Sequence, residues 1–442
     1  MRILIAVHGF PPTHSAGAER QAERMAHWLA RNGHEVEVFA VEKMDEPGFR
    51  VETDQQDGLI LHKLYYDINA GDDPFRNSYD NPQIGDALRK VLSKHPFDVA
   101  HLISGYLLGS QIISTAKAMG IPVVVSPMEF WFLCTRLNLM HASGELCIGP
   151  ESDQKCMRCL MEDKRRYRRP AELAPGLMNV FWGIAQHLPF TQELTQDVAQ
   201  RRTHLQAALN SADLVICNSQ FLIHKFQEFG FDTQKFQYIR QGLTTSIDQK
   251  PSASGQTETL RLGYIGQIKQ HKGVDLLVDA VIGLLNDGKN VSLDIWGNEA
   301  EAPDYTGDLK ARSAAYPSIH WNGRYVGSKV WDVIGSFDAL VVPSRWYENS
   351  PNVILEAFEM HRPAIVTNLG GMAELVEHDK SGLVFDFNSV ADLRRQIERL
   401  LTEPDLLKQL QAGIPSVKRI DDEMREVIVQ YEILVKPSIT TG

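Results

Sequence analysis

The chain of 442 residues contains no apolar run long enough to span a bilayer. Its opening stretch, Met1 to Val7, is shorter than the apolar core of a signal peptide, and no small-residue cleavage site follows it. Positive charge is also scarce, because the formal net charge is -11. An acidic chain lacks the basic surface that phosphate backbones require, so nucleic acid is excluded as the main partner. These features predict a cytoplasmic protein.

Cysteine is scarce as well, with five residues in the chain. In a cytoplasmic protein such cysteines are more often metal ligands or free thiols than disulfides. Cys156 and Cys159 have the C-x2-C spacing that brings two thiolates to one tetrahedral ion, and Cys134 and Cys147 lie shortly before them. We therefore predict a structural zinc or iron–sulfur site on these four residues. Free or paired thiols remain the alternative, since Cys134 and Cys147 lack zinc-knuckle spacing.

A dinucleotide fingerprint is absent too. Neither half of the chain has G-x-G-x-x-G after its first predicted strand, which argues against a nicotinamide dehydrogenase. The hydrophobic content of 43% and the charged content of 23% are ordinary for a globular protein. The length allows two or three domains with substantial cores.

What the chain does contain is a repeated alternation of short β-rich runs and amphipathic stretches, typical of parallel sheets covered by helices. We predict two doubly wound α/β domains that face an interdomain cleft. The expected parts are an N-terminal domain over 1–243 with a helical, cysteine-containing insertion at about 134–212, a polar linker over 244–259, a second domain over 260–416, and a helix in 417–442 that packs back on the first domain. Strands are predicted at 3–7, 35–41, 59–64, 98–102, 122–126, 214–217 and 236–239, and again at 260–265, 291–296, 319–321, 339–342, 364–367 and 383–385.

The most informative stretch lies between 337 and 357. A buried strand is followed by Glu348 and by a helix that we expect to begin at Pro351, with Asn349 or Ser350 as its cap. The free amides at that helix start predict an anion site. Glu348 lies before the helix and Glu356 inside it, roughly 9 Å apart along the axis.

Carboxylates on either side of an anion site are suited to hydroxyl-rich groups, because each oxygen accepts hydrogen bonds. The pattern therefore indicates a site for a nucleotide-sugar. Two solvated surface glutamates are the plainer alternative.

Several segments, in this order, resemble the retaining GT-B glycosyltransferases of family 4. The matching segments are Pro11 to Arg20, Gly263 to Leu277 with Lys272, Trp296-Gly297, Trp321 to Tyr325, Glu348 with Glu356 at E-x7-E spacing, and Gly370 to Glu374. One such motif would be weak evidence. Six in order, covering nearly the whole chain outside the insertion, indicate the family and with it the GT-B fold.

The resemblance also implies roles for individual residues. The first glutamate of the pair, Glu348, would hold donor-sugar hydroxyls and Glu356 the ribose, while Lys272 would neutralise the diphosphate. With Glu129, Glu348 and Lys272 form the predicted catalytic set. The predicted donor-binding set is Ala16, Gly17, Gly266, Gln267, Lys272, Gly297, Tyr325, Glu348, Asn349, Ser350, Asn352, Val353 and Glu356.

The chemistry of these residues agrees with those roles. An ammonium beside helix amides can stabilise a diphosphate leaving group, and Gly17 allows a backbone to approach a phosphate closely. An exposed lysine and an ordinary turn glycine are the alternatives.

The implied reaction is transfer of a sugar, with retention, from a UDP- or GDP-sugar to a hydroxyl of a carbohydrate or lipid-linked acceptor. The resemblance suggests a role in surface polysaccharide or glycolipid synthesis, with no cofactor required for catalysis. A sugar-nucleotide hydrolase or epimerase and a catalytically silent scaffold are the alternatives.

The chain departs from the family pattern at five positions. Gln267 stands where an arginine is usual, Ala16 replaces a glycine, and Pro351 removes an amide. Met128 and Glu129 occupy the places of the family's histidine and aspartate. Glu129 is either an acceptor contact or a structural residue.

One basic run, Lys164 to Arg169, stands out on this acidic chain. It can contact an anionic membrane surface or a lipid-pyrophosphate acceptor, which would place the protein at the inner face of the cell membrane. A solvated helix face is the alternative.

Overall fold

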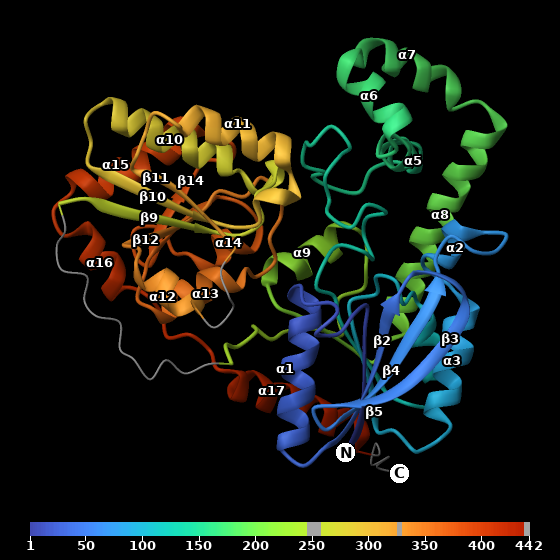
Figure 1. Cartoon of the computed structure of the whole chain (residues 1–442). Coiled ribbons are helices and arrows are strands. Elements are labelled where there is room, and N and C mark those ends of the chain that lie inside the picture. The colour runs from blue at the N-terminus through green and yellow to red at the C-terminus, as the bar shows by residue number, and fades with distance from the viewer. Residues whose placement is uncertain (245–257, 325–328, 437–442) are drawn as a thin grey trace. The chain divides into compact units, whose positions relative to one another are not determined.

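The computed structural model describes residues 1–244, 258–324 and 329–436 and divides into two units (Figure 1). The first unit joins Met1–Arg240 to the segment that begins at Ile420, and the second comprises Gln241–Arg419. Most of the predicted linker, residues 245–257, and the predicted site residue Tyr325 lie outside the described residues. Among the described residues, no helix combines the length and the apolar character needed to cross a membrane.

The first unit is built on an eight-stranded sheet with the order β3-β4-β2-β1-β5-β6-β7-β8. Its strands are β1 (Arg2–Val7), β2 (Glu35–Lys43), β3 (Asp45–Gln56), β4 (Leu59–Asp67), β5 (Val99–Ile103), β6 (Val123–Ser126), β7 (Leu214–Cys217) and β8 (Phe236–Tyr238). All neighbours pair in parallel except β3, which is antiparallel to β4. The central strands β1 and β5 are buried, as expected for a sheet covered on both faces.

Sequence analysis missed β3. This strand is polar and contains Pro47 and Gly48, so it has none of the apolar alternation of a buried strand. It forms because it pairs along the length of β4 and lies at the sheet edge, where charged residues and proline are tolerated.

Helices cover this sheet and form the insertion. They are α1 (Gly17–Arg31), α2 (Pro74–Asn77), α3 (Pro82–Leu92), α4 (Gln111–Ala118), α5 (Asp153–Glu162), α6 (Arg165–Leu173), α7 (Pro175–Ala185), α8 (Pro189–Ser211), α9 (Gln220–Glu228) and α17 (Ile420–Val435). Helix α17 belongs to this unit, because Trp28 Nε1 donates to Asp421 Oδ1 at 2.6 Å and the buried Tyr431 contacts His101.

The second unit has a six-stranded parallel sheet with the order β11-β10-β9-β12-β13-β14. Its strands are β9 (Leu260–Ile265), β10 (Val291–Trp296), β11 (Ile319–Gly323), β12 (Ala339–Val342), β13 (Ala364–Thr367) and β14 (Gly382–Phe385). Its helices are η1 (Gln270–Lys272), α10 (Val274–Asn286), η2 (Glu299–Glu301), α11 (Pro303–Ser313), α12 (Val330–Gly335), α13 (Asn352–Glu359), α14 (Gly370–Leu375), α15 (Val390–Thr402) and α16 (Leu406–Ala412). Two apolar clusters pack this sheet.

Strand order reverses once in each sheet. The reversal falls between β1 and β5 in the first unit and between β9 and β12 in the second. Open parallel sheets bind ligands beside such a reversal, at the carboxyl ends of the strands. The loops that follow these four strands are therefore where a functional site is expected.

Candidate functional site

Two loops of the second unit meet beside the strand-order reversal. One follows β9 and forms the short η1 helix that carries Lys272, and the other follows β12 and carries Glu348. Between η1 and α10, Gly273 has φ 69°, and a Cβ at this position would lie 2.0 Å from the carbonyl oxygen of Pro343. Only glycine therefore allows the η1 turn to pack directly against the loop after β12.

This packing brings Lys272 and Glu348 together, although 76 positions separate them in the chain. Lys272 Nζ donates to Glu348 Oε1 at 2.6 Å, and Ser344 Oγ donates to the same oxygen at 3.0 Å. The ammonium also lies 4.4 Å from the ring centroid of Trp346. The two charged side chains are only 16% and 15% exposed, so the pair is screened little by solvent.

Protonation states at this pair follow from burial and charge. Burial alone would raise the pKa of Glu348, but the Lys272 ammonium and its hydrogen bond hold that pKa below its ordinary value. Burial and the same ammonium lower the pKa of His271 to about 4. The site at neutral pH thus contains a carboxylate, an ammonium and a neutral imidazole.

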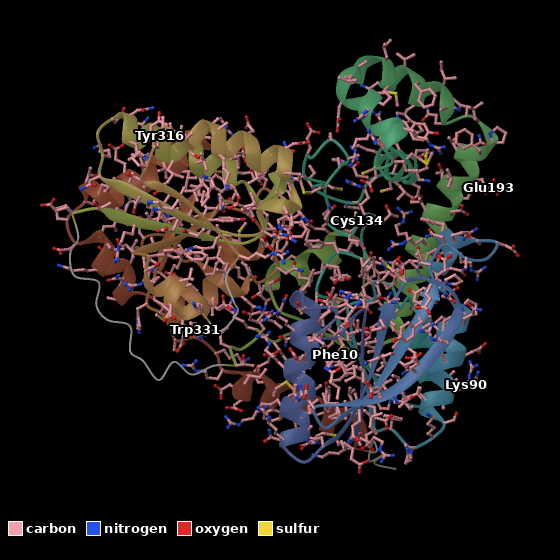
Figure 2. The ribbon with its side chains drawn as sticks, viewed as in Figure 1. Phe10, Lys90, Cys134, Glu193, Tyr316 and Trp331 are labelled. Atoms are coloured by element: carbon pink, nitrogen blue, oxygen red, sulfur yellow. The ribbon has the colours of Figure 1, made fainter. Side chains whose placement is uncertain are left out.

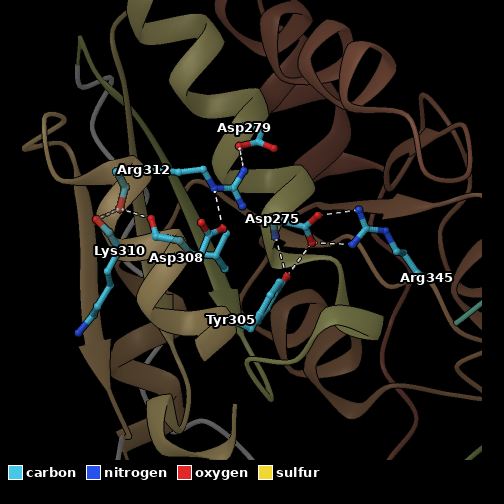
Figure 3. A network of polar contacts seen from close by, with 9 residues as sticks. Asp275, Asp279, Tyr305, Asp308, Lys310, Arg312 and Arg345 are labelled. Atoms are coloured by element: carbon cyan, nitrogen blue, oxygen red, sulfur yellow. Dashed lines mark hydrogen bonds and ion pairs between the residues drawn. The ribbon is translucent and has the colours of Figure 1, made fainter. Parts of the chain in front are cut away.

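A network of polar contacts fixes the two loops to each other (Figure 3). The Arg345 guanidinium forms a bidentate pair with Asp275 at 2.6 and 2.7 Å, and the Arg345 amide donates to the His271 carbonyl at 2.8 Å. Tyr305 OH donates to Asp275 Oδ1 at 2.6 Å. Sequence reasoning missed these residues because their spacing shows no motif; the nearest signal was the Arg345-Trp-Tyr run before Glu348.

The helix after Glu348 differs from the prediction at its start. Helix α13 begins at Asn352, with Pro351 as the N-cap, and neither Asn349 nor Ser350 caps it by a side-chain hydrogen bond in the described structure. Pro351 takes an extended conformation, with ψ 117°, and so precedes the helix. Gln241 Nε2 secures this start by donating to the Ser350 carbonyl at 2.8 Å and to Asn352 Oδ1 at 2.5 Å.

A second glycine holds the same loop from the other side. The Gly371 amide donates to the Glu348 carbonyl at 2.7 Å, and a Cβ on Gly371 would lie 1.6 Å from the Asn349 carbonyl oxygen. The predicted glycine turn at Gly370-Gly371 therefore has a direct packing role: it positions the backbone that carries Glu348.

The other predicted donor residues of the second unit lie around these loops. Gly297 packs against the β9 loop, because a Cβ there would be 2.3 Å from the Gly266 carbonyl oxygen. Gln267 is exposed, and Lys269 pairs with Glu301 at 3.6 Å.

The remaining predicted donor residues are spread over both units. Val353 and Glu356 lie on α13 and are partly buried. Ala16 and Gly17 are exposed at the start of α1, in the first unit. That they close over a donor diphosphate stays a prediction.

The first unit has its own polar cluster beside its strand-order reversal. His8 follows β1, Ser104 follows β5 and Glu129 follows β6. Ser104 Oγ donates to Glu129 Oε1 at 2.7 Å, and His8 Nε2 lies 3.2 Å from Glu19 Oε1. His8 Nδ1 and Glu19 Oε2 are buried and have no hydrogen-bond partner within the described ranges. Sequence reasoning found Glu129 but missed His8 and Glu19, although the position of His8 directly after the first strand was a usable signal.

These groups influence one another. Burial raises the pKa of Glu129, an effect that the positive charge of His8 only partly offsets. Burial would lower the pKa of His8, but the contact with Glu19 and the charge of Glu129 raise it. The cluster thus places two carboxyl groups beside one imidazole ring, an arrangement suited to accepting hydrogen bonds from hydroxyls.

All five cysteines are described and are free thiols. Four of them line one small cavity in the insertion of the first unit, where Figure 2 labels Cys134. The four are Cys134, Cys147, Cys156 and Cys159, and His141 and Glu151 line the same cavity.

Comparison with known proteins identifies the two halves separately. Residues 259–403 match the family model described as glycosyl transferases group 1, and residues 16–242 match that of the glycosyl transferase 4-like domain. The chain is 28% identical over 158 residues to alpha-D-kanosaminyltransferase of Streptomyces kanamyceticus, covering 35% of this chain and 40% of that protein. It is 24% identical over 238 residues to D-inositol 3-phosphate glycosyltransferase of Streptomyces bingchenggensis, covering 50% and 52%. The matched region thus spans about half or less of these relatives.

Solved structures agree over almost the full chain. Sucrose-phosphate synthase from Thermosynechococcus elongatus superposes with a TM-score of 0.64 at 14% identity, covering 98% of this chain and 99% of that one. The Anabaena protein Alr3699/HepE in complex with UDP and glucose gives 0.60 at 14% identity, covering 97% and 99%. These likenesses show the GT-B fold, in agreement with the two parallel-sheet units. With a family model matching each of its halves, the chain belongs to the group 1 glycosyltransferases, family 4.

Proposed function

We propose that the protein transfers a sugar from a nucleoside diphosphate sugar, a UDP- or GDP-sugar, to an acceptor hydroxyl with retention of anomeric configuration. The observation that carries this proposal is the Lys272–Glu348 pair, held at 2.6 Å by loops that follow the two strands flanking the strand-order reversal of the second unit. Support also comes from the glycosyltransferase relatives and from the UDP present in a structural neighbour.

The pair has the charges that this reaction requires. As the bond from the anomeric carbon to the diphosphate breaks, negative charge grows on the leaving oxygen and positive charge on the sugar ring. The Lys272 ammonium and the free amides at the α13 start stabilise the leaving group, while Glu348 accepts hydrogen bonds from sugar hydroxyls. The acceptor oxygen then bonds to the anomeric carbon on the face that the diphosphate leaves, and its proton passes to the leaving phosphate oxygen. Because the protein supplies the positive charge, the proposed reaction needs no divalent ion.

We assign acceptor binding to the first unit. The cluster of His8, Glu19, Ser104 and Glu129 offers carboxyl oxygens and an imidazole beside the strand-order reversal, and two of its buried polar atoms are free to bond a ligand. A carbohydrate or lipid-linked hydroxyl fits these groups. We place the reaction in surface polysaccharide or glycolipid synthesis, at the inner face of the cell membrane, with Lys164 to Arg169 as the peripheral contact.

Calorimetric titration with UDP, GDP and their sugars tests donor binding. We expect one nucleotide series to bind, and the sugar-free diphosphate to compete with its sugar conjugate. NMR of the glycosylated product then determines the anomeric configuration of the transferred sugar, which we expect to match that of the donor. A chain that binds none of these ligands would be a silent scaffold, and one that releases free sugar regardless of acceptor would be a hydrolase.

A further inference from the structure

A small cavity with a mostly apolar lining lies in the insertion of the first unit. Its volume is ≈ 30 Å³, and four thiols from three chain segments line it. Cys156 and Cys159 are one turn apart on α5, so they share a helix face. Cys134 comes from the loop after β6, and Cys147 from the segment beside the Met140–Leu146 bridge. A cavity of this size holds one or two atoms of the size of a water oxygen.

Arg136 places hydrogen-bond donors beside two of these sulfurs, those of Cys134 and Cys159. The Arg136 amide donates to Cys134 Sγ at 3.4 Å, and the Arg136 guanidinium lies 4.0 Å from Cys159 Sγ. Such outer contacts to thiolate ligands are a regular part of metal sites. The ring of His141, a carboxylate oxygen of Glu151 and Cys147 Sγ lie within 4.8 Å of one another and offer a second ligand set. Glu151, however, already pairs with Lys155 at 2.7 Å.

We propose that Cys134, Cys147, Cys156 and Cys159 bind one structural Zn²⁺ as thiolates and thereby hold α5 against the loop after β6. Four thiolates match the preference of zinc for a closed, tetrahedral sulfur site. Each thiol loses its proton to solvent on binding, and no oxidation step is involved. His141 and Glu151 are assigned to the surroundings of this site.

Elemental analysis of the purified chain tests the site, with the double variants Cys156→Ser/Cys159→Ser and His141→Ala/Glu151→Gln compared directly. We expect one zinc per chain in the wild type and in the His141/Glu151 variant, and loss of zinc in the cysteine variant. Retention by the cysteine variant, zinc lost only from the His141/Glu151 variant, or the visible absorption of an iron–sulfur cluster would overturn the proposal. If the cysteine variant fails to fold, Co²⁺ exchange into the wild type still tests the site. The proposal requires that the cobalt-substituted protein show thiolate-to-cobalt charge-transfer bands, and their absence would overturn it.

A different observation concerns the tip of the insertion, where α6 and α7 extend beyond the sheet of the first unit (Figure 1). Seven of the thirteen exposed large apolar side chains found in the described residues fall between 173 and 190. They are Leu173 (85% exposed), Leu177 (73%), Val180 (63%), Phe181 (42%), Ile184 (67%), Leu188 (44%) and Phe190 (44%).

Helix α7 is apolar on two faces. Met178, Trp182 and Ala185 point into an apolar cluster within the insertion. Leu177, Ile184 and their neighbours recur at intervals of three and four residues on the exposed face. A helix with a second apolar face in water indicates an interaction surface.

The basic residues that directly precede this exposed apolar face indicate which partner it binds. Lys164, Arg165, Arg166, Arg168 and Arg169 are all exposed, and within the described ranges no ion pair joins any of them to a carboxylate. A cationic cluster directly beside an exposed apolar stripe is complementary to an anionic lipid bilayer, with headgroups against the arginines and acyl chains against α7.

We propose that α6 and α7 form a membrane-docking surface for anionic bilayers. This inference rests on the proposed function, since it gives the transferase access to a lipid-linked acceptor, but it is measured without turnover. Basic residues near an anionic surface each favour binding about 5-fold, so Arg165→Gln/Arg168→Gln should weaken binding roughly 25-fold.

Sedimentation with vesicles of phosphatidylcholine, alone or mixed with phosphatidylglycerol, tests this surface. We expect the wild type to bind the anionic vesicles in a salt-sensitive manner. The variant Leu177→Glu/Ile184→Glu should lose this binding. The control Val429→Glu/Ile433→Glu, which alters the exposed apolar pair on α17, should retain it. Equal loss in both variants, or binding indifferent to phosphatidylglycerol, would overturn the proposal. Concentration-dependent self-association of the wild type without vesicle binding, abolished by Leu177→Glu/Ile184→Glu, would assign the face to a second copy instead. Nucleotide binding, measured by calorimetry, tests the proposed function separately from vesicle binding.

Discussion

Replacing Lys272 and Glu348 one at a time should have opposite consequences for the donor diphosphate. In the structure each group neutralises the other at 2.6 Å, with side chains 16% and 15% exposed. Lys272→Met removes the cation that is proposed to contact the diphosphate. A hydrogen bond to a charged group contributes about 1.5–3 kcal/mol, so UDP or GDP should bind roughly 30-fold more weakly, equivalent to about 2 kcal/mol. Glu348→Gln releases the ammonium, so the bare diphosphate should bind as well as before or better, while the nucleotide-sugar loses affinity.

The same substitutions should also lower the free energy of unfolding. Breaking a fully buried ion pair costs about 3–5 kcal/mol and an exposed pair about 0–1 kcal/mol. For a pair that is mostly buried, we expect each single variant to lose about 2 kcal/mol in chemical denaturation. The double variant Lys272→Met/Glu348→Gln should lose less than the sum, since neither charge is left alone.

Acid provides an independent check of the same pair. The folded pKa of Glu348 lies below its ordinary value of 4.5, so its stabilising effect is present above about pH 4.5 and is lost as the pH falls through the folded pKa. The difference in stability between the wild type and Glu348→Gln should therefore shrink on acidification. Two results would refute the proposal that this pair binds the donor. One is a loss of stability in the double variant equal to the sum of the single losses, and the other is an equal loss of diphosphate binding in both single variants.

The remaining predictions concern the positions that support the two sites. Gly273→Ala should lower thermal stability and nucleotide affinity more than Gly288→Ala, because both glycines have positive φ (69° and 71°) but only a Cβ at Gly273 meets a neighbour, at 2.0 Å. Arg345→Lys should weaken nucleotide binding by about 1–2 kcal/mol in calorimetry by removing the bidentate contact to Asp275, while far-UV circular dichroism stays unchanged. Glu129→Gln should raise the melting temperature at neutral pH and lower transfer to the acceptor. Because burial raises the pKa of this carboxyl, the stabilising effect should vanish at a pH below the ordinary value of 4.5, where the wild-type carboxyl is protonated in both states.

Much of the architecture could be predicted because local pattern and long-range structure agree. The buried strands have apolar runs bounded by turn residues, and β7, β9, β10, β12 and β13 begin and end where the sequence predicted. Lys272 and Glu348, both members of the predicted catalytic set, lie at hydrogen-bond distance from each other, although the sequence did not predict this direct contact.

Features that depend on pairing between distant residues could not be predicted in this way. The polar β3 strand is defined by its pairing with β4, not by its own composition. The Arg345–Asp275 pair links positions 70 residues apart, and the His8–Glu19 contact joins a strand end to a helix whose first-turn glutamate looks like ordinary dipole compensation. In each case a single residue gives no local signal, and only the fold supplies its partner.

The charges beside the two strand-order reversals support the proposal that the two units bind different substrates. Each unit has a basic side chain against a carboxylate at that place, but the second unit uses a lysine and the first a histidine that faces both Glu19 and Glu129. In the second unit an arriving diphosphate can replace one carboxylate as the partner of a permanent ammonium, beside amides that also favour an anion. In the first unit a phosphate would lie beside two carboxyl groups and one titratable ring, so binding an anion there would be electrostatically unfavourable. A neutral hydroxyl, in contrast, can donate to those oxygens without adding charge. The difference in charge therefore favours the proposed arrangement, with the donor bound by the second unit and the acceptor by the first.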